Sequence, residues 1–276
     1  SPLGYDYLAR PAQLVPVTAA ALPEVSADGR SFTLRLQPGI HFADDPAFKG
    51  RPRELVAQDY VYSIKRFFDP RWNSSDLYLY ESLQLPGLAA LREQAIKTRR
   101  PFDYDRPVEG LRALDRYTLR ITLGVPDPRF MYLLADAQMM GAVAREVVEH
   151  YGDDIGAHPV GTGAFRLKVW RRSSRIVLER SPGHRGTAYA GTPADAPEAR
   201  AAAAHLAGKT LPLVDEVVID VVEEAQPRWL SFLDGSYHWL EVPTTLRALA
   251  APNGQLAPYL ARRGITLQRQ PRPDMV

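Results

Sequence analysis

Hydrophobic and polar residues alternate along two short stretches in the first half of the chain. Phe32, Leu34 and Leu36 are separated by single polar residues, and residues 117–123 read YTLRITL. A period of two places every second side chain on the same face of an extended chain. The pattern therefore predicts two β-strands, each with one face buried and one face in solvent.

A helical period follows the first of these strands. In residues 54–68, apolar side chains recur every three or four positions, at Val56, Tyr60, Ile64 and Phe67. This spacing places them on one face of a helix. Pro70 disfavours a helical conformation at Asp69 and so ends the element. The following residues, 71–86, are rich in aromatic and polar side chains and are predicted to form an irregular loop.

Strand-like and helix-like periods continue through the second half. Residues 164–170 and 175–179 alternate on either side of a short polar turn, which predicts a β-hairpin. Residues 181–211 are rich in Ala, Gly and Pro with little periodicity, so a surface excursion is expected there. Elsewhere in the chain, helices are predicted at 88–98, 142–151 and 226–233. Strands are predicted at 213–222 and 265–270.

These elements together predict a mixed α/β (α+β) fold. The strands are separated too irregularly along the chain for a regular array of strand–helix–strand units. The predicted secondary structure changes just before Gly161, where helical segments are followed by the hairpin. We therefore expect two regions, residues 1–156 and residues 157–276.

Composition narrows the possible classes of protein. The 276 residues include no cysteine, which excludes disulfides and thiolate chemistry, and the formal net charge is only +2. No apolar stretch reaches the roughly 18 residues that a membrane helix needs. The first residues show neither the basic nor the apolar region of a signal peptide, so a signal peptide is not expected in this chain.

No enzyme motif is recognisable. Gly161, Thr162 and Gly163 form a G-x-G, but the third glycine of a dinucleotide fingerprint is missing, and the following residues are strand-like. The six histidines form no pair with metal-ligand spacing, so no metal and no cofactor are expected. The basic runs at 97–100 and 171–175 lack the interleaved aromatics of a base-stacking surface. We therefore predict neither catalysis nor nucleic-acid binding.

Four blocks of sequence together resemble the conserved pattern of one known family. The most specific block is residues 159–186, PVGTGAFRLKVWRRSSRIVLERSPGHRG. The chain departs from the family pattern there at residues 181–185, SPGHR, where Asn-Pro-x-Tyr-Trp is usual. The other matching blocks are ALPEVSADGRSFTLRLQPGIHF at 21–42, AQDYVYSIKRFFDP at 57–70 and LPLVDEVVIDVVEEAQPRWLSFLDGSYHWLE at 211–241. On these blocks the chain resembles the extracellular solute-binding proteins of ABC importers, family 5, which includes oligopeptide- and dipeptide-binding proteins.

The resemblance implies a fold similar to the type II periplasmic binding proteins. Residues 1–156 would be the extra subdomain of the first lobe, and residues 157–276 part of the main ligand-binding lobe. The chain would stop before the hinge, with the second lobe absent. The implied protein is a periplasmic monomer that binds a peptide or similar small solute and delivers it to an inner-membrane ABC permease.

Two groups of candidate ligand-binding residues follow from the resemblance. Gly161, Thr162 and Gly163 would let the backbone approach the ligand closely, or would form only a turn that enters the hairpin. Tyr78 and Tyr80 follow the Asp-Pro stop where some oligopeptide binders place an aromatic facing the cleft, although local packing of the loop is the alternative.

Two alternative functions are compatible with the same four blocks of sequence. The protein would then be the solute-sensing domain of a regulator, or a binder of a nickel chelate, haem or opine.

Overall fold

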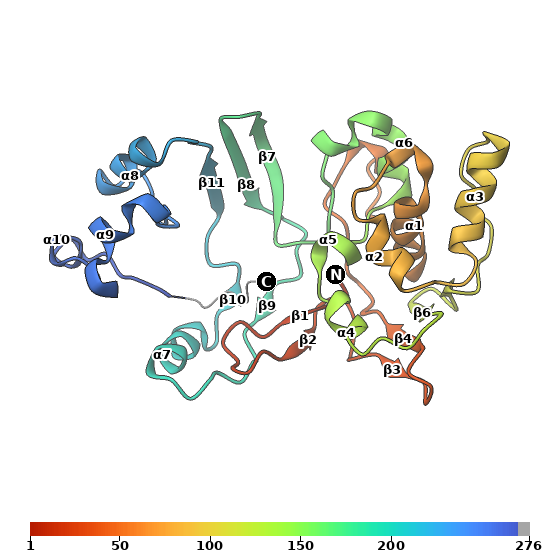
Figure 1. Cartoon of the computed structure of the whole chain (residues 1–276), viewed down its shortest axis with the longest axis horizontal. Helices are drawn as coiled ribbons and strands as arrows, with labels where there is room; N and C mark the ends of the chain where they lie inside the picture. Colours follow the sequence, from red (N-terminus) through yellow and green to blue (C-terminus); the bar gives the residue numbers. More distant parts are fainter. Residues whose placement is uncertain (270–276) are drawn as a thin grey trace. The chain divides into compact units, whose positions relative to one another are not determined.

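The computed structural model describes residues 1–269 of the chain (Figure 1). It divides into two compact units. The first comprises Ser1–Trp170 and Val177–Val217, and the second comprises Arg171–Ile176 and Val218–Val276. The boundary expected at 156/157 lies inside the first unit, and the assignment of its two sides to parts of a lobe stays a prediction.

A four-stranded antiparallel sheet lies in the first unit. Its strand order is β3–β4–β6–β5, with bounds β3 (Glu24–Val25), β4 (Ser31–Arg35), β6 (Thr118–Thr122) and β5 (Leu111–Ala113). Phe32 pairs with Ile121 and Leu34 with Leu119, and all four side chains are buried. The two alternating stretches of the sequence are thus confirmed as neighbouring strands, with one face on the core.

Helix α1 (Ala57–Phe68) packs beside this sheet and is the most deeply buried helix of the first unit (Figure 1). The predicted helix is confirmed, but it begins three residues later than its apolar period suggests. Its last core residue is Phe68, which is 2% exposed, whereas the neighbouring Phe67 is only partly buried. Helix α3 (Leu88–Thr98) has the bounds that its sequence predicts.

The irregular loop expected at residues 71–86 is partly wrong. Helix α2 (Leu77–Ser82) lies within it and buries Tyr80 completely. Six residues are too few to display a helical period, so tertiary packing of an aromatic side chain decides the conformation. The remaining elements of residues 1–157 are β1 (Leu3–Tyr5), β2 (Leu14–Pro16), η1 (Pro46–Phe48), η2 (Pro70–Trp72), α4 (Phe130–Leu133), α5 (Ala137–Met140), α6 (Arg145–Tyr151) and η3 (Gly152–Ala157).

The predicted hairpin is confirmed as β7 (Phe165–Arg171) and β8 (Arg175–Arg180). Strand β11 (Glu216–Asp220) adds to it, which gives a three-stranded sheet of order β11–β8–β7. The intervening residues are more regular than expected, because they contain helix α7 (Pro197–Leu206). They also contain the short antiparallel pair β9 (Thr187–Ala188) and β10 (Thr210–Leu211).

The second unit has a small core of its own. Trp229, Ala250, Ala257 and Leu260 are buried together, and Ile265 packs against them. The elements are α8 (Ala225–Leu233), η4 (Thr244–Leu246), α9 (Arg247–Ala250), η5 (Pro252–Gly254) and α10 (Pro258–Ala261). The strand predicted at 265–270 is wrong over 265–269, where the backbone pairs with no strand, and residue 270 lies outside the described residues.

Within residues 1–269, no helix combines the length and the apolar character that crossing a bilayer requires.

Candidate functional site

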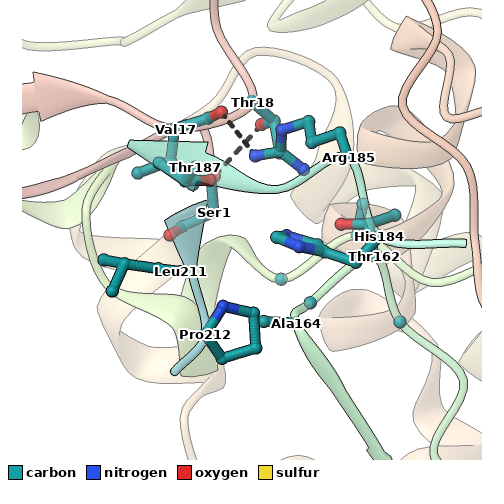
Figure 2. A pocket seen from close by; sticks show the side chains of 14 residues that line it. Ser1, Val17, Thr18, Thr162, Ala164, His184, Arg185, Thr187, Leu211 and Pro212 are labelled. Carbon is teal, nitrogen blue, oxygen red and sulfur yellow. Dashed lines mark hydrogen bonds between the residues drawn. The ribbon is translucent and has the colours of Figure 1, made fainter. Parts of the chain in front are cut away.

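A cavity of about 400 Å³ lies in the first unit beside Gly161, Thr162 and Gly163 (Figure 2). We call it the 161–163 cavity. Its walls come from segments that are far apart in the sequence: the start of the chain, the end of α5, the entry to β7, and the stretch that includes β9 and β10. Only the tertiary fold brings these segments together.

The entry to β7 supplies backbone groups to this cavity. The carbonyl of Gly161 accepts a hydrogen bond of 2.8 Å from the N–H of Ala43, which anchors the turn. Within residues 1–269, the N–H groups of Thr162 and Gly163 donate to no other group. Two backbone donors therefore remain available at the cavity wall.

The two glycines of this turn are not required by the fold. Neither has a positive φ angle, and a Cβ atom built on Gly161 would meet no atom within 4 Å. On Gly163 the nearest contact would be the Phe165 carbonyl oxygen at 3.8 Å, an ordinary distance. The fold therefore leaves open space where side chains at these two positions would stand.

A tight turn after β8 presents the next residues. The N–H of Ser181 donates to the Ala164 carbonyl at 2.8 Å, and the N–H of His184 donates back to the Ser181 carbonyl at 3.1 Å. Pro182, at the second position of this four-residue turn, has the φ angle that such a turn needs. The turn directs the imidazole of His184 toward the middle of the cavity, where Leu211 and Pro212 face it (Figure 2).

Gly186 is required where it stands. Its φ angle is +71°, and a Cβ atom there would lie 2.6 Å from Cγ2 of Thr210. This close approach lets the chain pass from His184 and Arg185 directly into β9.

The hydrogen bonds of His184 define its tautomer. Its Nδ1 accepts from the N–H of Gly186 at 3.2 Å, so the proton of the neutral ring is assigned to Nε2. Burial lowers the pKa of His184 below its usual 6.5, and the neighbouring Arg185 guanidinium lowers it further. At neutral pH the ring is therefore uncharged and keeps one N–H to donate.

Among the described residues that line the cavity, Arg185 supplies the only guanidinium and there is no lysine. Its Nη2 donates to the Val17 carbonyl at 3.0 Å (Figure 2), and the residue makes no ion pair within residues 1–269. No Asp or Glu of the described chain lines this cavity. The site thus combines a fixed positive charge and neutral donors with an apolar wall that includes Leu211 and Pro212.

A buried pair of hydroxyls anchors the part of the cavity wall that Ser1 and Thr18 form. Thr18 Oγ1 lies 2.6 Å from the Tyr60 hydroxyl of α1 and also donates to the Ser1 carbonyl at 3.0 Å. Complete burial raises the pKa of Tyr60, so its hydroxyl stays protonated. The first strands are thereby fastened to the main core.

A second cavity, of about 390 Å³, lies at the N-terminal end of α1. We call it the Arg53 cavity. Arg53 binds Asp59 at 2.6 Å and Glu146 at 2.8 Å, and Arg145 binds Asp105 and Glu149, each at 2.6 Å. Every carboxylate that lines this cavity is therefore paired with an arginine. Residues 1–269 hold no group of three or more His, Cys, Asp or Glu placed to bind a metal ion.

Comparison with known proteins identifies the family. The model of the bacterial extracellular solute-binding proteins, family 5 Middle, matches residues 13–269. The chain belongs to this family. Its members are solute-binding proteins rather than enzymes.

Curated relatives in the family match part of the chain. The periplasmic oligopeptide-binding protein OppA of Salmonella typhimurium is 33% identical over 157 residues, which are 56% of this chain and 26% of that protein. Di/tripeptide-binding protein 4 of Pseudomonas aeruginosa is 27% identical over 181 residues, which cover 62% of this chain and 29% of that protein. The chain thus spans between a quarter and a third of the length of these relatives.

Solved structures agree with the family fold. Haemophilus influenzae OppA in complex with the peptide RPPGFSPFR matches with a TM-score of 0.65 at 18% identity, covering 91% of this chain and 42% of that one. Burkholderia pseudomallei OppA matches with a TM-score of 0.63 at 19% identity, covering 91% of this chain and 42% of that one. The mixed α/β fold expected from the resemblance to periplasmic binding proteins is confirmed.

The structure separates the two groups of predicted site residues. Gly161, Thr162 and Gly163 all line the 161–163 cavity, and their contact with ligand stays a prediction. Tyr78 lies on α2 with 63% of its surface exposed and does not line this cavity.

Tyr80 requires a correction. The side chain is fully buried, its ring packs on Phe67 at 4.8 Å, and its hydroxyl donates to the Met139 carbonyl at 2.7 Å. A ligand has no exposed atom of Tyr80 to contact, so the structure assigns this residue to the core. Its helical position beside the Phe67–Phe68 pair, at the end of α1, was not visible in the sequence.

Sequence reasoning missed His184 and Arg185 as cavity residues. The available signal was the departure from the family pattern, because SPGHR replaces Asn-Pro-x-Tyr-Trp at residues 181–185. The sequence shows this replacement, but only the fold shows that His184 and Arg185 line a cavity.

Proposed function

We propose that the protein is the substrate-binding component of an ABC importer in the periplasm. It binds peptides, or small solutes of similar chemistry, and delivers them to an inner-membrane permease without chemical change. The single observation that supports this function most directly is the pair of free backbone donors, Thr162 and Gly163, at an open cavity in a member of this family.

The exposed backbone is suited to recognising another backbone. A peptide held through its main-chain carbonyl groups is bound with little regard to its side chains, as in strand addition. Thr162 N–H and Gly163 N–H are such donors, and the absence of side chains at Gly161 and Gly163 leaves room for a peptide to reach them. Water fills the space that a given side chain leaves, at little cost in affinity.

Transport adds a requirement for two conformations. Solute-binding proteins of this type close two lobes around the ligand by a hinge, and the closed form is presented to the permease. In this proposal the 161–163 cavity supplies part of the first lobe's contribution. Tyr78, exposed on α2, remains a second proposed ligand contact in the same protein.

The test is native mass spectrometry of the complete gene product as purified, followed by calorimetric titration with short peptides. A series of co-purified masses matching short peptides, with saturable binding in the micromolar range or tighter, is the expected result. A single non-peptide mass would replace the ligand class, and no binding to any peptide would contradict the proposal.

A pair of glycine variants tests the proposed contact. Gly161→Val places a side chain in front of the backbone donors, whereas Gly156→Val places it outside the cavity; both positions are free of neighbours within 4 Å and of positive φ angles. We expect Gly161→Val to weaken peptide binding at least about tenfold, which is the loss of one or two hydrogen bonds. The thermal unfolding of both variants should match the parent, and equal binding by both would overturn this contact.

A further inference from the structure

The 161–163 cavity differs from a neutral backbone-binding groove in one respect, its charge. Arg185 contributes a guanidinium with no ion-pair partner in residues 1–269, and no carboxylate lines the wall with it. The Arg53 cavity of nearly equal size has the opposite arrangement, since four carboxylates surround its two arginines. Within residues 1–269, the positive charge at Arg185 is therefore left without a carboxylate partner.

We propose that the 161–163 cavity binds a carboxylate group of the transported solute, with Arg185 and His184 as the residues that determine this specificity. This inference rests on the proposed function and adds the chemical class of the ligand group at that site.

The donors around the cavity match the acceptors of a carboxylate. An ionised carboxylate accepts several hydrogen bonds and donates none, and a guanidinium carries five N–H groups. One of these, on Nη2 of Arg185, donates to the Val17 carbonyl, which holds the side chain in place and leaves other N–H groups free. Charge-assisted hydrogen bonds of this kind are about twice as strong as neutral ones.

His184 adds a neutral donor of defined direction. Because its Nδ1 accepts from the N–H of Gly186, Nε2 carries the proton, and the ring points into the cavity toward Leu211 and Pro212 (Figure 2). The ring cannot rotate its acceptor nitrogen into the cavity without breaking that hydrogen bond. His184 therefore favours an acceptor group of the ligand over a donor group.

The sequence places both residues where the family pattern has aromatics. The turn from Ser181 to His184 brings them to the wall, and Gly186 is the residue that lets the chain enter β9 immediately afterwards. At these two positions this chain carries an imidazole and a guanidinium, both of which can donate hydrogen bonds. In this proposal these two side chains determine which ligand group the cavity favours.

The experiment is calorimetric titration of the complete gene product with four peptides of one length. These are Ala-Glu-Ala and Ala-Gln-Ala, each with a free C-terminal carboxylate and with a C-terminal amide. We expect loss of one of the two carboxylates to weaken binding about 10- to 100-fold, the range for a hydrogen bond to a charged group. The Glu-to-Gln arm identifies a side-chain carboxylate and the amide arm identifies the C-terminus.

Variants assign the effect to the cavity. In Arg185→Gln, whose amide can still donate to the Val17 carbonyl, the preference between the acid and its neutral counterpart should disappear. His184→Phe keeps a ring but removes the donor, and it should reduce that preference about three- to tenfold. The matched control is Arg100→Gln, which removes an exposed positive charge outside the cavity and should leave the preference unchanged.

Three results overturn the inference. If all four peptides bind equally well, the proposed function stands and the carboxylate assignment fails. If a preference for carboxylate persists in Arg185→Gln and His184→Phe, it originates outside this cavity. If none of the four peptides binds, the proposed function fails for peptides and this inference fails with it.

Discussion

The two cavities of the first unit are almost equal in volume but differ in how their charges are satisfied. In the Arg53 cavity, Arg53 and Arg145 bind four carboxylates at distances of 2.6–2.8 Å. In the 161–163 cavity, the Arg185 guanidinium has only a backbone carbonyl, and two backbone N–H groups have no partner within residues 1–269. The paired charges of the Arg53 cavity belong to the scaffold, whereas the unpaired donors of the 161–163 cavity remain available to a ligand.

We expect the largest effect from a variant that breaks the ion pairs of the Arg53 cavity. Asp59 is 3% exposed and accepts hydrogen bonds from two nitrogens of Arg53 and from the N–H of Val56 at the start of α1. Asp59→Ala leaves Arg53 partly unpaired and removes a helix cap. We expect the free energy of unfolding to fall by about 3 kcal/mol, as for other broken buried pairs, measured by urea denaturation.

The matched control is a variant of Arg185 in the 161–163 cavity. Arg185→Gln should change the free energy of unfolding by less than about 0.5 kcal/mol, because an exposed charge with no ionic partner contributes little. A similar loss of stability in both variants would remove the distinction between the two cavities.

The next effect concerns two glycines near the 161–163 cavity. Gly186→Ala forces a positive φ angle on a residue with a Cβ and brings that atom within 2.6 Å of Thr210. We expect a loss of about 2 kcal/mol, because both strain and a clash act there. Gly161→Ala, with open space and an ordinary φ angle, should leave the melting temperature unchanged; a comparable loss at Gly161 would mean that the fold itself requires that glycine.

The smallest effect concerns a matched carboxylate outside both cavities. Hydrogen bonds from Arg116, the N–H of Gly39 and Tyr117 lower the pKa of Glu54 to about 2. A carboxyl whose pKa is lower in the folded state becomes protonated at a higher pH in the unfolded state than in the folded state. Its contribution to stability is therefore complete above about pH 4.5, falls as the pH drops, and is lost below about pH 2.

The measurement compares the parent with Glu54→Gln across that pH range. At pH 7 the variant should be less stable by about 1 kcal/mol, the usual net value of a lost hydrogen bond. The difference between the two proteins should shrink as the pH falls from 4.5 to 2. A difference that stays constant over this range would contradict the assigned pKa.

Elements with a long hydrophobic period were predictable from the sequence. The strand at Phe32 and Leu34, helix α1 and the β7–β8 hairpin were predicted because alternation or helical spacing reports directly which face is buried. Helix α2 and the helix at Pro197–Leu206 were missed, since the first is too short for a period and the second exposes most of its surface. The final strand was predicted from alternation alone, although Ile265 packs on the small core of the second unit instead.

The candidate site was predictable only in part. Gly161, Thr162 and Gly163 were selected through the family resemblance, and all three line a cavity. Tyr80 was selected by the same route and is a core residue, because an aromatic side chain in a short segment gives no sign of whether it faces a cleft or the core. His184 and Arg185 were noticed only as departures from a pattern.

The family, the mixed α/β class, and the strands and helices with periodic burial all follow from the amino-acid sequence, because they depend on the local order and spacing of side chains. The absence of cysteine chemistry follows from the sequence as well. Tertiary structure alone decided which charges are matched and which are free. Arg53 and Glu146, or Arg185 and Val17, are far apart along the chain, and a hydrogen bond between them exists only after folding has brought their segments within 3 Å.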